Sequence, residues 1–271
     1  MNRLSLAPLT IGEAGPLELI SAAKAGGFDA VTIRMIAAPG VETTAPVAGD
    51  KAMIAAIRQR LADNGIAAFG AAGIWLAPEF DVTQFDGALA AAAELGAVDF
   101  LAVGFDSDWP RLVANFAALC EAAAPYRLRV SLEFMPYLPV RTVADAARLL
   151  ADADQPNGGI VVDALHLARA DGTPADVAAV DPSRISYVQL CDAPRVRPAT
   201  LERREESLRH RLYPGDGDLP LFDLMDALPP DVTIDLETPC AADARLPFDE
   251  RARRAGNAAR RFLEAYRKHR G

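Results

Sequence analysis

Four oxygen-bearing side chains each follow a short apolar run in the second half of the sequence. They are Glu133, Asp163, Gln189 and Glu237. If these runs are neighbouring parallel strands, their carboxyl ends meet at one edge and the four side chains can converge. Three carboxylates and one amide oxygen suit a hard divalent cation such as Mg²⁺, Mn²⁺ or Co²⁺. One such carboxylate could equally pair with an arginine, but four oxygen donors on successive strands favour a metal, because a dication offsets the mutual repulsion of the three carboxylates.

A histidine lies close to this predicted metal site. His166 follows Asp163 by three residues, on what we expect to be the loop just past the strand. A lone histidine is more often structural than catalytic, but a position beside a metal favours a role in the chemistry.

The elements that would position these residues alternate regularly along the chain. Short apolar runs predict strands at residues 4–10, 30–36, 66–75, 100–105, 129–135, 159–165, 185–191 and 232–236. Amphipathic or alanine-rich segments predict helices at residues 16–25, 50–64, 88–95, 109–124, 142–150, 174–180, 221–228 and 249–269. Strict alternation over this length predicts an α/β fold with a closed parallel sheet, a single (β/α)8 TIM barrel. A doubly wound open sheet is the alternative, but Ile11-Gly12-Glu13-Ala14-Gly15 is not the glycine fingerprint expected after its first strand.

No linker rich in Pro, Gly and Ser divides the chain, so residues 1–271 are expected to form one domain. A long polar connection, residues 192–218, interrupts the pattern after the seventh strand. Such a segment on the catalytic face of a barrel is usually a lid or a binding loop. Its arginines favour an anionic substrate, since guanidinium groups pair with carboxylate or phosphate. We expect Arg195 and Arg211 to bind substrate, and Arg203 and Arg204 to lie on a short solvated helix.

The first half of the chain offers fewer chemical signals. Candidate walls of a substrate pocket are Arg34, Phe69, Trp75, Phe105 and Trp109. We count Arg34 among the expected substrate-binding residues, whereas the aromatic side chains could equally belong to the core.

Amino-acid composition and charge argue against several classes of protein. The chain has 271 residues, 51% of them hydrophobic, and a net charge of −9, which argues against binding nucleic acid through phosphates. The three cysteines lie far apart in the sequence, which argues against a disulfide framework and against a zinc-thiolate site. The first residues do not read as a secretory signal, and no apolar stretch is long enough to cross a membrane, so we expect a cytoplasmic location without a membrane partner. A homo-oligomer is compatible with this surface.

The motifs together resemble the xylose isomerase-like TIM-barrel superfamily, often labelled sugar phosphate isomerase/epimerase. They are LEFMP around Glu133, VDALH ending at His166, YVQLCDAP around Gln189, RLYPGDGDLP from Arg211 and DLETP around Glu237. The resemblance covers the second half of the chain, and the first half matches only in the rhythm of its elements. It implies that Glu133, Asp163, Gln189 and Glu237 ligate one divalent metal. It also implies catalytic roles for Glu133, His166 and Glu237, with His166 touching substrate.

Gln189 restricts the resemblance to fewer branches of the superfamily, because most members have histidine at this position. In having glutamine there, the chain resembles bacterial 3-dehydroshikimate dehydratases and hydroxypyruvate isomerases. The latter carry Pro-Gly-Arg soon after the glutamine, whereas this chain has Ala193-Pro194-Arg195. Some dehydratases have histidine two residues after the glutamate of the fifth strand, where this chain has Met135.

The chemistry that the resemblance implies begins with removal of a proton next to a carbonyl group of a keto-polyol or keto-acid. Because the insertion is rich in arginine, we favour dehydration of a carboxylated cyclic substrate such as 3-dehydroshikimate to protocatechuate. A keto-sugar or keto-sugar phosphate isomerase or epimerase is the alternative, and a non-catalytic sugar-binding barrel is a third. The endonuclease IV branch needs a histidine-rich trinuclear zinc site, which three histidines in all cannot build.

Overall fold

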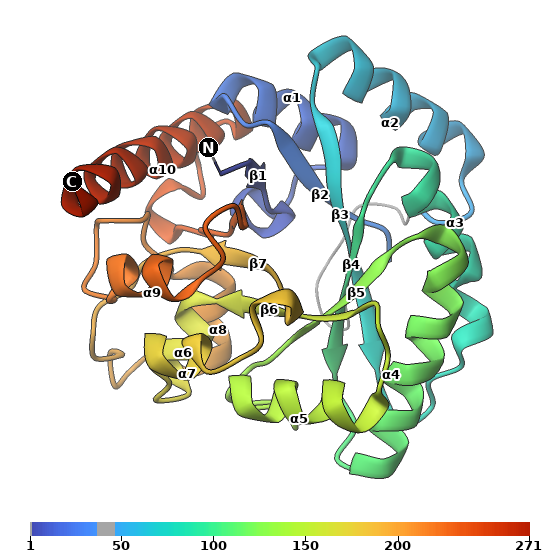
Figure 1. Cartoon of the computed structure of the whole chain (residues 1–271). Coiled ribbons are helices and arrows are strands. Elements are labelled where there is room, and N and C mark those ends of the chain that lie inside the picture. The colour runs from blue at the N-terminus through green and yellow to red at the C-terminus, as the bar shows by residue number, and fades with distance from the viewer. Residues whose placement is uncertain (1, 37–46) are drawn as a thin grey trace.

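The computed structural model describes residues 2–36 and 47–271 and contains a closed barrel of eight parallel strands (Figure 1). Neighbouring strands follow sequence order, and the last strand pairs with the first. The strands are β1 (Leu4–Leu6), β2 (Ala30–Arg34), β3 (Ala67–Leu76), β4 (Asp99–Gly104), β5 (Arg129–Glu133), β6 (Gly158–Asp163), β7 (Ile185–Leu190) and β8 (Thr233–Leu236). The predicted (β/α)8 barrel is confirmed, and the open sheet is excluded.

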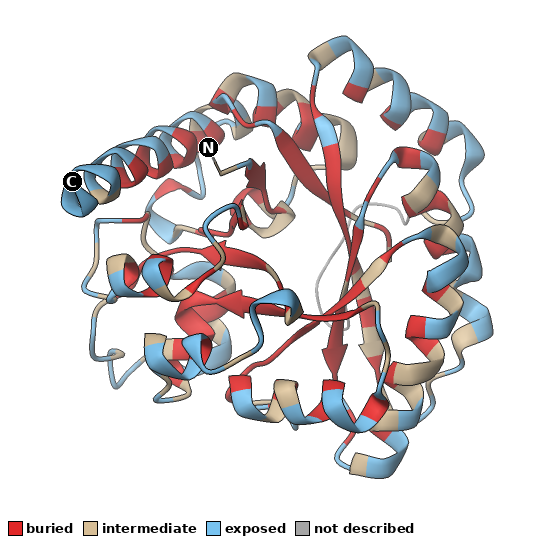
Figure 2. Ribbon diagram, viewed as in Figure 1, coloured by how far each residue is buried: buried red, intermediate tan, exposed pale blue. Residues whose placement is uncertain are grey.

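Helices form a ring around this barrel, with buried inner faces and exposed outer faces (Figure 2). They are α1 (Pro16–Gly26), α2 (Lys51–Asn64), α3 (Asp86–Leu95), α4 (Trp109–Ala123), α5 (Val143–Ala153), α6 (Ala164–Arg169), α7 (Pro174–Ala178), α8 (Arg203–Arg209), α9 (Leu221–Ala227) and α10 (Phe248–Arg270). The C-terminal helix α10 packs against α1, so the ring closes where the chain began (Figure 1). None of the helices in the described part of the chain has the length and apolar character needed to cross a bilayer.

Local sequence signals explain where α2 begins and ends. The Asp50 side chain accepts a hydrogen bond from the backbone amide of Met53, which satisfies a free donor of the first turn. Gly65 ends the helix with a φ of 62°, in the left-handed region that glycine adopts without strain.

Several predicted strands end one to four residues earlier than expected, and side-chain chemistry explains two of these differences. The first strand ends at Leu6 rather than at residue 10, because Pro8 opens a short 3-10 turn, Pro8–Ile11. The sixth ends at Asp163 rather than at residue 165, because the Asp163 carboxylate caps α6. His166 therefore lies within α6 and not on a loop, so that prediction was wrong.

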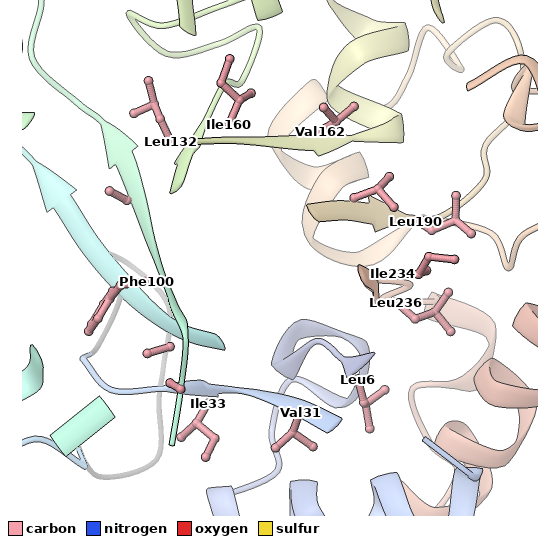
Figure 3. Packing of buried hydrophobic residues seen from close by; sticks show 14 of the residues in the cluster. Leu6, Val31, Ile33, Phe100, Leu132, Ile160, Val162, Leu190, Ile234 and Leu236 are labelled. Atoms are coloured by element: carbon pink, nitrogen blue, oxygen red, sulfur yellow. The ribbon is translucent and has the colours of Figure 1, made fainter. Parts of the chain in front are cut away.

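The hydrophobic core lies mainly between the strands and the surrounding helices. Figure 3 shows outward-facing strand residues of this layer, among them Leu132, Ile160 and Val162. Alternate strand residues face the inside of the barrel. There a small separate cluster includes Phe69 and Tyr187, whose rings meet edge to face at 5.2 Å. This cluster fills the barrel beneath the strand ends.

A buried carboxyl group lies at the start of β4. Asp99 is 3% exposed and accepts a hydrogen bond from Ser131 Oγ at 2.5 Å. Its Oδ1 atom has no hydrogen-bond partner among the described residues. Burial raises the pKa of Asp99 to about 7, although the Ser131 hydrogen bond and the charge of Arg129 act in the opposite direction.

This carboxyl group gives a pH dependence with a defined sign. Its folded-state pKa of about 7 lies above the ordinary value of 3.8. The folded protein therefore holds a proton that the unfolded chain releases, and stability falls as the pH rises through this window. We expect Asp99→Asn to lack this loss of stability. The difference in free energy of unfolding between the variant and wild type should therefore shift in favour of the variant by roughly 2 to 4 kcal/mol from about pH 4 to about pH 8. Urea unfolding across this range measures the gain, and Asp231→Asn in an exposed turn is the control. Equal pH profiles for the Asp99 variant and wild type would contradict the assignment.

Candidate functional site

The carboxyl ends of the strands open into a cavity of about 560 Å³. Apart from Arg34 at the end of β2, its polar side chains gather at the ends of β5 to β8 and on the segments that follow them. The ionisable ones are Arg34, Glu133, Tyr137, His166, Arg204, Arg211 and Glu237. The strand register places Asp163 next to Gln189 on the adjoining strands at this same end.

Asp163 connects the strand end to the rest of the site. Its Oδ1 atom accepts hydrogen bonds from the backbone amides of Leu165 at 2.8 Å and His166 at 3.0 Å. Its Oδ2 atom accepts one from Arg211 Nη1 at 2.6 Å, and Arg211 Nη2 lies 3.1 Å from Glu237 Oε2. One guanidinium group, 2% exposed, thus bridges two buried carboxylates. Burial opposes ionisation of Asp163, but the charge of Arg211, and that of His166 when it is protonated at low pH, hold the pKa of Asp163 below the ordinary value.

Glu133 and His166 form the second contact of the site. Glu133 Oε1 lies 3.6 Å from His166 Nε2. Ligand atoms of Glu133, Asp163 and His166 all lie within 4.8 Å of one another, a spacing that could hold a metal ion. Burial, together with the negative charges of Glu237 and Asp163, raises the pKa of Glu133 well above its usual range. Burial lowers the pKa of His166 to about 4, so its imidazole is neutral near pH 7 in the metal-free protein.

Glu237 completes the acidic group. Burial raises its pKa to about 7, while the charge of Arg211 acts in the opposite direction and that of Asp163 adds to the rise. The three carboxyl groups therefore disfavour one another's ionisation, and Arg211 compensates only part of their charge. A cation placed among them would relieve this repulsion.

Gln189 provides an independent test of the fit to a metal. Its side chain is 2% exposed, and its Oε1 atom has no hydrogen-bond partner among the described residues. A buried amide oxygen without a donor is costly unless something else binds it. Together with the neighbouring carboxylates, this oxygen fits a divalent ion.

Arg34 and Arg211 line the cavity in different ways. Burial lowers the pKa of Arg34, and the charge of Glu237 acts against this shift. No described carboxylate lies within ion-pair distance of the Arg34 guanidinium group. Arg211 was predicted to bind substrate from the insertion, but both of its terminal nitrogens already contact carboxylates of the site. Arg195 is exposed and is not among the residues that line the cavity, so the structure does not bring it to the site.

The remaining wall of the cavity is apolar. Trp75 and Phe105 meet edge to face at 5.4 Å. Further apolar contacts come from Leu9, Leu101, Val103, Met135 and Leu138. Of the other predicted wall residues, Phe69 lies in the cluster inside the barrel, and Trp109 packs at the surface under Arg148.

Three polar residues that line the cavity were not predicted from the sequence to do so. Tyr137 Oη and Ser207 Oγ are hydrogen-bonded at 2.9 Å across the cavity, and Arg204 lies on the same helix as Ser207. The predicted helix at Arg203 and Arg204 exists, but one face of it lines the cavity. The spacing of Arg204, Ser207 and Leu208 along one helix face was the available signal.

Comparisons with known proteins identify the family and the fold of the chain. A family model described as a xylose isomerase-like TIM barrel matches residues 20–265. A 3-dehydroshikimate dehydratase of Pseudomonas aeruginosa is 35% identical over 123 residues, which are 45% of this chain and 18% of that protein. The match thus spans less than a fifth of that relative's length.

Two solved structures share the fold. The IOLI protein with a binding zinc atom has a TM-score of 0.78 and 18% identity, over 97% of this chain and 99% of that one. The probable 3-DHS dehydratase AsbF of Bacillus anthracis has a TM-score of 0.76 and 13% identity, over 96% and 99% of the two chains.

Proposed function

Since the chain belongs to the xylose isomerase-like TIM barrel family, we propose that it is a divalent-metal-dependent enzyme that removes a proton next to a carbonyl group. Within this class, we propose a dehydratase that converts a carboxylated cyclic keto-polyol, 3-dehydroshikimate, into protocatechuate. The sequence similarity to a bacterial 3-dehydroshikimate dehydratase supports this substrate.

The metal would be held by Glu133, Asp163, Gln189 and Glu237. Two observations support this ligand set: Gln189 Oε1 has no hydrogen-bond partner among the described residues, and the buried carboxylates repel one another. When bound, Mg²⁺, Mn²⁺ or Co²⁺ would act as a Lewis acid that stabilises negative charge on a carbonyl oxygen. The zinc of the IOLI protein, which shares the fold, supports the class of ion.

The residues of the chain would move the protons. Glu133 or His166, 3.6 Å apart, accepts the proton from the carbon next to the ketone. The hydroxyl group on the following carbon then leaves as water, with Glu237 as the candidate donor of its second proton. Transfer of a further ring proton to the former ketone oxygen makes the ring aromatic. The balance is loss of one water from the substrate.

The single observation that carries the choice of substrate is the two-sided cavity. Acidic groups lie at the ends of β5, β6 and β8, whereas the ends of β3 and β4, on the other side of the closed barrel, carry Trp75, Phe105 and other apolar side chains. A neutral sugar exposes hydroxyl groups all round and would leave them unpaired against this wall. A flat ring with its oxygens on one edge fits both sides, and arginines that line the cavity offer guanidinium groups for its carboxylate.

Incubation with 3-dehydroshikimate tests this function. We expect the Mn²⁺-loaded protein to generate the ultraviolet absorption of protocatechuate, and a chelator to stop the reaction until metal is restored. No absorption, together with entry of solvent deuterium into a ketose, would replace the proposal by an isomerase or epimerase. Binding of sugars without any turnover or effect of chelators would indicate a non-catalytic barrel.

A further inference from the structure

Helix α8 forms a roof over one side of the cavity. Three of its residues, Arg204, Ser207 and Leu208, line the cavity. Their spacing of three and four positions places them on one face of the helix. The neighbouring Arg203 does not line the cavity. The helix belongs to the insertion between β7 and α9, outside the regular alternation of the barrel.

A buried ion pair holds this roof in place. Arg169 of α6 donates to Glu206 of α8 through Nε at 2.8 Å and through Nη2 at 2.7 Å. The same Nη2 donates to the carbonyl oxygen of Pro194 at 2.8 Å. Arg169 and Glu206 are 8% and 1% exposed, so the pair lies within the protein. A bidentate pair of this kind fixes the relative orientation of the two side chains as well as the distance between them.

Two further contacts fix the cavity side of α8. Ser207 Oγ is hydrogen-bonded to Tyr137 Oη at 2.9 Å. The carbonyl oxygen of Ser207 accepts a hydrogen bond from Arg211 Nε at 2.8 Å. Since Arg211 itself contacts Asp163 and Glu237, the roof is tied to the acidic side of the site. The position of Arg204 is thus set relative to the reacting groups.

Arg204 has no described charged partner of its own. No described carboxylate lies within 4.0 Å of its guanidinium group, whereas Arg209 at the end of the same helix faces Glu205 at 3.6 Å. A positive charge at the roof of the cavity, without an acidic partner in the described chain, is suited to an anionic group of a ligand.

We propose that Arg204 is a specificity-determining residue that binds the carboxylate of the substrate at the roof of the cavity. The ring oxygens of the same substrate face the acidic groups. Arg169 and Glu206 are positioning residues, because they hold α8 without lining the cavity. The identity of the ligand rests on the proposed function, but the recognition of a carboxylated ring by Arg204 is tested by binding alone.

The test compares two ligands and two neighbouring arginines. Protocatechuate and catechol share the ring and its hydroxyl groups, and only protocatechuate has a carboxylate. Their binding to the Mn²⁺-loaded protein is measured by isothermal titration, with the fluorescence of Trp75 at the cavity as a second readout. We expect wild type to prefer protocatechuate, and Arg204→Gln to weaken protocatechuate binding by about 10- to 100-fold while leaving catechol binding unchanged. Arg203→Gln, on the adjacent residue that does not line the cavity, should match wild type.

The outcomes separate this inference from the proposed function. If wild type makes no protocatechuate from 3-dehydroshikimate but Arg204→Gln loses the preference for the carboxylated ring, the function is wrong and the inference stands. If turnover occurs but Arg204→Gln keeps the preference, or loses both ligands equally, the inference is overturned. A wild-type protein without any preference for protocatechuate over catechol overturns it as well.

Discussion

Replacing Glu237 by glutamine is expected to lower the turnover of 3-dehydroshikimate by about 10³-fold or more. Glutamine keeps the shape of the side chain but removes its charge and its capacity to exchange a proton. General acid–base groups contribute about 10²- to 10⁴-fold on their own. The loss of a proposed metal ligand adds to this effect. Rates of protocatechuate formation at saturating Mn²⁺ measure the loss.

The stability of the same variant separates loss of chemistry from loss of fold. Glu237 is the leading charge that raises the pKa of the buried Glu133 carboxyl group. Its neutralisation relieves repulsion, so the melting temperature without metal should equal or exceed that of wild type. The rise in melting temperature on adding Mn²⁺ should shrink, because a weaker ligand set stabilises the folded state less. Glu94→Gln, on an exposed side chain of α3, is the matched control. Wild-type turnover by Glu237→Gln would refute the assigned site.

The barrel was predictable because each strand carries its own signal. A strand packed on both faces is a short apolar run, and helix ends are marked by capping groups such as Asp50 and Gly65. Two of the errors in strand length fell where one residue ends a strand. Pro8 cannot continue a strand ladder, and Asp163 serves both as the last strand residue and as the cap of α6. The periodicity of apolar residues does not reveal either of these early strand ends.

The strand-end residues of the site were predictable for a related reason. Parallel strands bring their carboxyl ends to one face, and Glu133, Asp163 and Glu237 lie close to common partners there. The position of these residues in the sequence was enough to predict that they meet, because a strand fixes the direction of its side chains.

The arginines of the insertion were not predictable in the same way. A long flexible side chain on an irregular segment is placed by the partners it finds in the folded protein. Arg211 is drawn between two buried carboxylates, Arg195 stays in solvent, and Arg204 turns towards the cavity because α8 is docked. The contact that docks it joins Arg169 to Glu206, 37 positions apart, and no spacing rule relates these two residues.

This docking contact gives the second large effect. Arg169→Met would leave the Glu206 carboxylate buried, 1% exposed, without its partner. Breaking a buried ion pair from one side costs about 3 to 5 kcal/mol. Release of α8 into solvent would relieve that cost, because the Glu206 carboxylate would regain water. We therefore expect faster tryptic cleavage after Arg203, Arg204 or Arg209, and a rise in KM for 3-dehydroshikimate that exceeds any change in the global melting temperature.

A double variant distinguishes docking from general damage. Arg169→Met combined with Glu206→Leu replaces the charged pair by two apolar side chains, and such replacements of buried pairs are often neutral or stabilising. If the buried carboxylate is what undocks α8, the double variant should regain resistance to trypsin and a KM near that of wild type. Arg253→Met, which removes only half-exposed surface pairs on α10, should behave as wild type throughout. Protection of α8 in Arg169→Met equal to that in the Arg253 variant would mean that the ion pair does not hold the roof, and that the Ser207 contacts with Tyr137 and Arg211 are sufficient.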